Sequence, residues 1–152
     1  MIAYLSGPIE NALNDGAGWR NDITHWLENE LNHQVFNPVT ETKSITKELN
    51  TDDFRLMKTT NPEQYKNIIR KIIQVDLDAV VKGSDYLIVN WDESVFKGGG
   101  THGEITMAYW FNKPIYMVNV LPIEDVSSWI FSCTDYVFSN FEDLKIKLKE
   151  IY

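Results

Sequence analysis

The chain has 152 residues, 43% of them hydrophobic, which predicts one domain spanning residues 1–152 with a core of its own. Its single cysteine, Cys133, excludes an internal disulfide and a cysteine-rich zinc site. The 14 basic and 22 acidic side chains give a net charge of −8, which disfavours nucleic acid polymers as partners because their binding depends on neutralised phosphates.

The start of the chain predicts a strand, a helix and a second strand. Residues 2–6 are apolar and stop at Gly7-Pro8, residues 19–31 carry apolar side chains at helical spacing, and residues 34–37 form an apolar run that Pro38 ends. This β-α-β unit requires parallel pairing of its two strands.

The next segment, Thr40 to Asn61, is polar and has no sustained periodicity. We expect short helices within it, near residues 46–49 or 53–57, because a structureless loop of about twenty residues is unusual in a compact domain. The segment is either a lid over a binding site or a surface insertion.

The remainder alternates regularly between helix and strand. A helix beginning at Pro62 and stopping at Gly83 is followed by a strand, a glycine-rich turn and a second helix. The predicted elements are a helix over 62–82, a strand over 85–91, a helix over 102–111, a strand over 115–120, a short helix over 125–131, a weak strand over 136–138 and a helix over 141–151. In the last helix Phe141, Leu144, Leu148 and Ile151 should face inward.

This order predicts an α/β fold, a doubly wound, Rossmann- or flavodoxin-like parallel sheet of five strands with helices on both faces. With the strand order 2-1-3-4-5, ligands bind where the order reverses, beyond the carboxyl ends of the first and third strands. The turns at residues 6–8 and 90–101 should therefore face each other across one crevice. No run of about 18 apolar residues and no apolar leader is present, so we expect a cytoplasmic protein without a membrane partner.

The glycine-rich turn, Lys97-Gly-Gly-Gly-Thr-His-Gly-Glu104, contains the most informative carboxylate. Thr101 and Glu104 have the spacing of a capping box, in which each side chain bonds the other's backbone N–H. Alternatively, Glu104 is a nucleophile that the helix terminus keeps ionised. The two interpretations exclude each other, because a carboxylate fully engaged in a cap is not free to attack.

A second carboxylate, Asp76, falls in phase with the apolar residues of its helix, where an aspartate needs a partner or a function. It is either a site residue or a charge on the helix surface. Two separated carboxylates can cleave a glycosidic bond through a covalent intermediate.

The sequence contains no pattern for binding a metal or an organic cofactor. The histidines His25, His33 and His102 lack metal-ligand spacing, and the glycine turn matches neither the Gly-x-x-x-x-Gly-Lys-Ser/Thr nor the Gly-x-Gly-x-x-Gly motif of nucleotide-binding loops. We therefore expect neither a metal nor an organic cofactor.

These residues, in this order, resemble the nucleoside 2-deoxyribosyltransferase family, which includes related nucleotide N-glycoside hydrolases. The resemblance covers residues 2 to 120 and rests on Tyr4-Leu-Ser-Gly-Pro8, Val75-Asp76-Leu77, Ser84 to Val89, Gly100-Thr-His-Gly-Glu104, Ala108 and Lys113-Pro114. It implies cleavage of the bond between base and sugar, with Glu104 as nucleophile, Asp76 orienting or protonating the base, and Tyr4 holding the nucleophile. It also implies a homo-oligomer, a dimer or larger, that completes each site.

The rest of the site is expected from the crevice turns, which supply Gly7, Pro8, Asn90, Asp92, Gly98, Gly99, Gly100 and Thr101. Gly98 departs from the family, whose members often carry a polar residue there to hold the sugar's 5′ end. Either Thr101, Asp92 or Lys97 makes this contact, or the backbone of Gly98 to Gly100 binds a 5′-phosphate as a nest. Trp19, Arg20 and Trp91 are further candidates for contacting the base or a phosphate, and each also suits the core or the surface.

The function predicted from the sequence is therefore cleavage of the N-glycosidic bond of a deoxynucleoside or nucleotide through a glycosyl-Glu104 intermediate, with transfer of the 2-deoxyribosyl group to another base. The partners are a small nucleoside or nucleotide and a free base. The alternatives are a hydrolase acting on nucleoside 5′-monophosphates and a non-catalytic nucleotide-binding module in which Glu104 only caps its helix.

Overall fold

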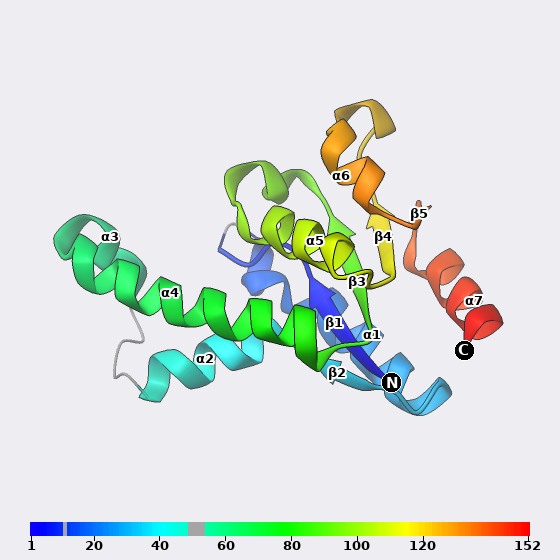
Figure 1. Ribbon diagram of the computed structural model, residues 1–152, viewed down its shortest axis with the longest axis horizontal. Coiled ribbons are helices and arrows are strands. Elements are labelled where there is room, and N and C mark those ends of the chain that lie inside the picture. The colour runs from blue at the N-terminus through cyan, green and yellow to red at the C-terminus, as the bar shows by residue number, and fades with distance from the viewer. Residues whose placement is uncertain (11, 49–53) are drawn as a thin grey trace.

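The computed structural model describes residues 1–10, 12–48 and 54–152. Its centre is a five-stranded, all-parallel sheet in the order β2-β1-β3-β4-β5 (Figure 1). The strands are β1 (Ile2–Ser6), β2 (Gln34–Phe36), β3 (Tyr86–Trp91), β4 (Ile115–Asn119) and β5 (Tyr136–Phe138). The doubly wound class and the strand order are as predicted from the sequence.

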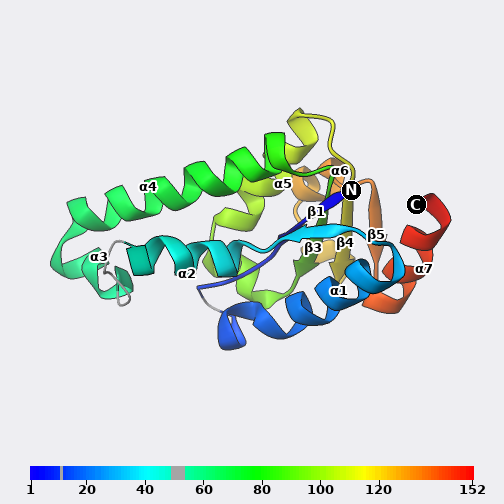
Figure 2. The ribbon, with the colours of Figure 1, turned by 90° about the horizontal axis from the view of Figure 1, so that it is seen from below.

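Helices cover both faces of this sheet because neighbouring residues of a strand point to opposite sides. On one face, residues such as Ile88 pack against α1 (Ala17–Glu30) and α7 (Phe141–Ile151). On the other, residues such as Val89 pack against α5 (Gly100–Trp110) and α6 (Ser128–Cys133). Figure 2 shows α1 and α7 below the sheet and α4 and α5 above it. Burial on both faces explains why β3 and β4 are apolar along almost their whole length.

A helical arm extends beyond the edge of the sheet (Figures 1 and 2). It consists of α2 (Pro38–Glu48), the 3₁₀ helix η2 (Phe54–Leu56), α3 (Met57–Thr60) and α4 (Pro62–Asp78) as far as Ile72. The arm has an apolar cluster of its own, separate from the two layers on the sheet; its buried members are Phe54, Ile68 and Ile72, with Ile45, Met57, Tyr65 and Ile69 packed against them.

The arm includes the segment from Thr40 to Asn61, within which short helices were predicted from the sequence. Residues 38–48 form one regular helix, which the sequence does not reveal because α2 buries only Pro38, Val39 and Thr46 and is otherwise polar. The short helices predicted over 46–49 and 53–57 fall partly on Leu49 and Asp53, which lie outside the described residues. The described part of the second begins as η2 and continues as α3.

Most other boundaries agree with the sequence. Helix α4 begins at Pro62, with Asn61 as its N-cap, and continues through a π-helical turn, η3 (Ala79–Gly83), to the predicted stop at Gly83. Short 3₁₀ helices precede α1 (η1, Leu13–Gly16) and α6 (η5, Ile123–Asp125). In α7, Leu144 and Leu148 are buried as predicted. The inward position predicted for Ile151 is wrong, because this residue ends the last turn of the helix and is 41% exposed.

None of the helices in the described part of the chain combines the length and the apolar character needed to cross a membrane.

Candidate active site

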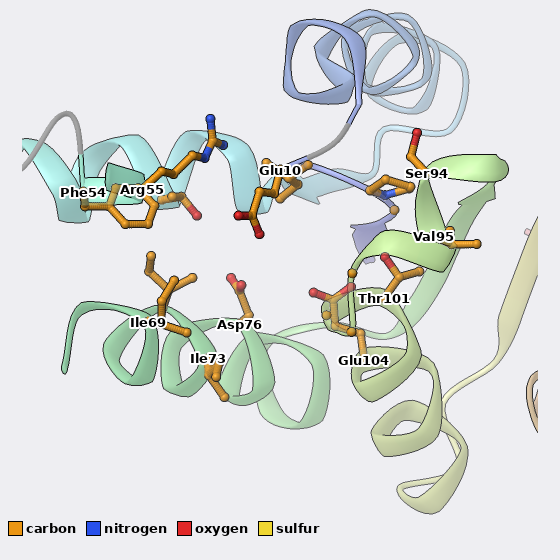
Figure 3. Close-up of a pocket in the computed structure, with 18 of the residues that line it drawn as sticks. Glu10, Phe54, Arg55, Ile69, Ile73, Asp76, Ser94, Val95, Thr101 and Glu104 are labelled. Carbon is orange, nitrogen blue, oxygen red and sulfur yellow. The ribbon is translucent and has the colours of Figure 1, made fainter. Parts of the chain in front are cut away.

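A cavity of about 260 Å³ opens at the carboxyl ends of β1 and β3, where the strand order reverses. Its walls come from the loop after β1, from the helical arm, from α4 and from the start of α5 (Figure 3). The two predicted turns do face each other, since a β-carbon on Gly7 would lie 3.2 Å from the carbonyl oxygen of Asn90. Both carboxylates singled out in the sequence, Asp76 and Glu104, line the cavity.

Glu104 is held by two hydroxyl groups from β1. The Tyr4 hydroxyl donates a hydrogen bond to Oε1 at 3.0 Å, and the Ser6 hydroxyl donates to Oε2 at 2.5 Å. Burial raises the pKa of Glu104, while the bonds from Ser6 and Tyr4 and the charge of Arg20 act to lower it. Each carboxylate oxygen keeps a lone pair beyond the bond it accepts, so the group is fixed in place and still able to act as a nucleophile.

This arrangement rules out the capping-box interpretation of Glu104. Helix α5 begins at Gly100, so Thr101 lies inside the helix, and its N-cap, Gly99, has no side chain with which to cap it. The side chain of Glu104 bonds to β1 instead of to the backbone of its own helix. Thr101 is also buried and lines the cavity.

Asp76 projects into the cavity from the last turn of α4 (Figure 3). Burial, together with the charges of Glu104 and Glu41, raises the pKa of Asp76 to about 8. A carboxyl group with this pKa holds its proton at neutral pH. Its neighbour Asp78 is exposed and pairs with Lys82 at 2.7 Å, which agrees with the expectation that only one of the two aspartates reaches the site.

The glycine turn does not form the anion-binding nest considered from the sequence. A nest requires left-handed backbone, and Gly16 is the one glycine with positive φ among the described residues. Gly98 is extended and Gly99 has a right-handed conformation. Gly98, Gly99 and Gly100 nevertheless line the cavity. A β-carbon at Gly98 or Gly99 would meet no atom within 4 Å, so the space beside these two glycines is not filled by other protein atoms.

Asn90 and Asp92 are not among the described residues that line the cavity. The Asn90 amide donates to Asp92, and Asp92 accepts a hydrogen bond from the Ser94 N–H as the N-cap of η4 (Glu93–Lys97). Their polar groups are therefore used to shape the turn after β3. The short 3₁₀ helix that Asp92 caps replaces the open loop expected at this point.

Three other residues considered from the sequence serve the structure. Trp91 is 1% exposed and belongs to the core. Trp19 stacks on Phe141 and carries the Arg20 guanidinium over its ring. Arg20 is fully buried and donates to the carbonyl oxygens of Leu5, Gly7, Pro8, Asp15 and Gly16. Arg20 thus fixes the β1–α1 loop, which includes the cavity-lining residues Gly7 and Pro8.

Sequence reasoning missed several lining or supporting residues. Ser6 was placed in the turn at residues 6–8 without a role of its own, Glu10 was given no role, and Phe54 was expected only within a short helix. An apolar wall formed by Phe54, Ile69 and Ile73 closes the end of the cavity away from Glu104 (Figure 3), and Ile72 also lines the cavity. The alternation of β1 was the available signal for Ser6, because Tyr4 and Ser6 share one face of the strand.

The hydroxyl of Ser6 is expected to contribute to the function of Glu104. Replacing Ser6 with Ala removes one hydrogen bond to the carboxylate, which should raise its pKa further and lower turnover about tenfold, since a bond to a charged group contributes roughly 1.5–3 kcal/mol. The measurement is a pH–rate profile, whose acidic limb should move to higher pH. Ser84→Ala is the matched control, because this buried serine bonds the carbonyl of Val80 away from the site. Equal profiles for the two variants would contradict a role for Ser6.

The residues described contain no group of three or more His, Cys, Asp or Glu side chains arranged to hold a metal ion.

Comparison with protein-family models gives no match, and comparison with curated proteins gives none. Among solved structures, the chain is similar to the 2-deoxyribosyltransferase of the psychrotolerant bacterium Bacillus psychrosaccharolyticus, with a TM-score of 0.57. The match covers 95% of this chain and 90% of that one. The chain has the fold of that 2-deoxyribosyltransferase. The sequence identity is 15%, so the similarity establishes the fold, and the activity has to be argued from the site.

Proposed function

We propose that this protein cleaves the N-glycosidic bond of a deoxynucleoside and transfers the 2-deoxyribosyl group to a second base. The observation that carries the proposal is the pair of carboxyl groups in one cavity with different environments. Glu104 is anchored by Tyr4 and Ser6, and Asp76 has a pKa of about 8. One anchored nucleophile and one carboxyl group that keeps its proton are the two groups that such a reaction needs.

In the first half-reaction, an oxygen of Glu104 bonds to the anomeric carbon of the sugar. The bond from that carbon to the base nitrogen breaks, and its electron pair stays with the base. Asp76 gives its proton to the departing base, which would otherwise leave as an unstable anion. General acid assistance of this kind typically contributes about 10²- to 10⁴-fold in rate.

In the second half-reaction, a nitrogen of an incoming base attacks the anomeric carbon and Glu104 leaves as a carboxylate. The ionised Asp76 then takes the proton that the incoming base loses, which restores both groups. The energetic reason for a covalent intermediate is that it divides one difficult substitution into two easier ones. All the groups in this scheme are side chains of the protein, so the proposal needs no cofactor.

The fold is consistent with a deoxyribosyl transfer, but it does not by itself distinguish transfer from hydrolysis. The solved structure to which the chain is similar is a 2-deoxyribosyltransferase, and the cavity lies at the switch point where ligands of such sheets bind. The main alternative is hydrolysis of nucleoside 5′-monophosphates, in which water replaces the second base. The missing nest at Gly98 to Gly100 favours the uncharged nucleoside over the monophosphate.

The experiment that tests the proposal supplies the protein with deoxynucleosides or their 5′-monophosphates, with and without a second free base, and follows all bases by chromatography. Exchange of one base for another is the expected result. Release of free base without exchange would show a hydrolase instead. Ligand binding without any product would replace the proposal with a non-catalytic binding module.

We also propose that the protein acts as a homo-oligomer. The end of α5 and the neighbouring α6 expose large aromatic side chains, including Trp110 and Trp129, which are 75% and 67% exposed. Such groups on one region of a surface are typical of contacts between subunits. A monomeric mass measured by light scattering would contradict this part of the proposal.

A further inference from the structure

Glu10, in the loop after β1, lines the cavity but has no place in the reaction described above. Its side chain is exposed, and no hydrogen bond or ion pair holds it within the described part of the molecule. Figure 3 shows its carboxyl group directed across the cavity toward that of Asp76, on the opposite wall. Glu10 thus presents a free hydrogen-bond acceptor to whatever occupies the cavity.

The other ionisable groups of the cavity indicate which ligands the Glu10 acceptor favours. Of the described lining residues, Arg55 is the one with a cationic side chain. Its guanidinium bonds Asp15 at 3.0 Å and points away from the cavity in Figure 3. The lining residues Glu10, Asp76 and Glu104 all carry carboxyl groups, of which that of Asp76 holds a proton at neutral pH. A ligand with hydrogen-bond donors therefore suits this lining better than one with carbonyl oxygens in the same positions.

The position of the base follows from the order of groups along the cavity. Glu104 stands at one end, where the sugar must react, and the apolar wall of Phe54, Ile69 and Ile73 stands at the other (Figure 3). The flat, apolar faces of a base fit against this wall. Asp76 and Glu10 lie between the two ends, so each meets a polar edge of the base.

Bases differ at these edges in a simple way. Adenine and cytosine carry an exocyclic amino group that donates hydrogen bonds, guanine carries both an amino group and a carbonyl oxygen, and thymine carries carbonyl oxygens. A carboxylate only accepts hydrogen bonds. It therefore binds an amino group and repels a carbonyl oxygen placed at the same point.

We propose that Glu10 accepts a hydrogen bond from an exocyclic amino group of the base and thereby selects amino-bearing bases at this site. The inference rests on the proposed function, because it assumes that the ligand is a nucleoside. It assigns Glu10 to substrate choice and leaves the bond-breaking steps to Glu104 and Asp76.

The test compares substrates that differ by a single group. Deoxyadenosine and deoxyinosine differ at position 6, deoxyguanosine and deoxyinosine at position 2, and deoxycytidine and deoxyuridine at position 4 of the base. We expect kcat/KM to favour the amino-bearing member of at least one pair by about tenfold or more, since losing a hydrogen bond to a charged group has an effect of this size. In Glu10→Gln the ratio should fall toward one, because an amide both donates and accepts.

A binding measurement separates this inference from the proposed function. Calorimetric titration of the same nucleosides into Glu104→Gln reports base selection without turnover. Absence of turnover in the wild type would refute the catalytic proposal. The inference about Glu10 would still stand if Glu104→Gln binds amino-bearing bases more tightly and the double variant Glu10→Gln/Glu104→Gln loses this preference.

Two results would overturn the inference. One is turnover with no preference in any pair, and the other is a preference that persists unchanged in Glu10→Gln. Glu124→Gln, a substitution in the distant helix η5, is the matched control and should keep the wild-type ratios.

Discussion

Replacement of Glu104 with Gln is expected to lower the rate of base exchange by about 10³-fold or more, because removal of a covalent nucleophile leaves only the binding and acid contributions of the site. An amide has nearly the shape of a carboxylate and can still accept a hydrogen bond from Tyr4 or Ser6. The fold should therefore be retained. Single-turnover kinetics with a radiolabelled sugar would measure the loss.

The same experiment can observe the intermediate. With wild-type protein and no acceptor base, the 2-deoxyribosyl group should remain on the protein after denaturation, and mass spectrometry should place it on Glu104. Glu93→Gln is a suitable control, because Glu93 is exposed in η4 and does not line the cavity. Labelled protein from Glu104→Gln, or exchange near the wild-type rate, would refute the assignment of the nucleophile.

Replacement of Asp76 with Asn should lower kcat/KM by about 10²- to 10⁴-fold for bases that need a proton to leave. In the wild type, the active form requires a protonated Asp76. Because its pKa is about 8, kcat/KM should fall as the pH rises through that value. The variant should lose this alkaline limb. Asp78→Asn is the control, since Asp78 lies on the same helix but pairs with Lys82 at the surface.

The raised pKa of Asp76 also predicts an effect on stability with a definite sign. The folded state holds the proton up to about pH 8, whereas the unfolded chain releases it near the ordinary aspartate pKa of 3.8. The folded state therefore binds more protons between these values, and the contribution of Asp76 to stability decreases as the pH rises through them. Asp76→Asn should unfold at the same or a higher denaturant concentration than the wild type at pH 8. A clear loss of stability there would indicate that Asp76 is structural.

The sheet could be predicted because its signals are local. The apolar strands, Pro38 after β2 and Gly83 after α4 mark boundaries within a few residues, and parallel pairing follows from the β-α-β unit. Glu104 and Asp76 could be located because a carboxylate in phase with apolar residues is unusual. Helix α2 could not be predicted, because most of its residues are polar and it contacts α4 and β1 through only a few buried side chains.

The remaining site residues depend on contacts between distant parts of the chain. Ser6 bonds Glu104 across 98 positions in the sequence, and no local pattern contains that information. Asn90 and Asp92 were placed in the site by their position at the carboxyl end of β3, but Asp92 accepts the Ser94 N–H as the cap of η4 and the Asn90 amide donates to the Asp92 carboxylate. Thr101 suggested a cap for a helix starting at residue 102, yet α5 begins two residues earlier, at Gly100, and this difference frees Glu104.

The separate apolar cluster of the helical arm implies that the two halves of the cavity belong to different cooperative units. Glu104 and its two hydroxyl partners are fixed to the sheet, whose opening requires global unfolding. Phe54 and the rest of the wall opposite Glu104 belong to a small cluster with few buried side chains, which can open locally at a lower free energy. A ligand that contacts Phe54 and Ile69 would stabilise the closed arm, so we expect amide-exchange protection in the arm to increase on binding.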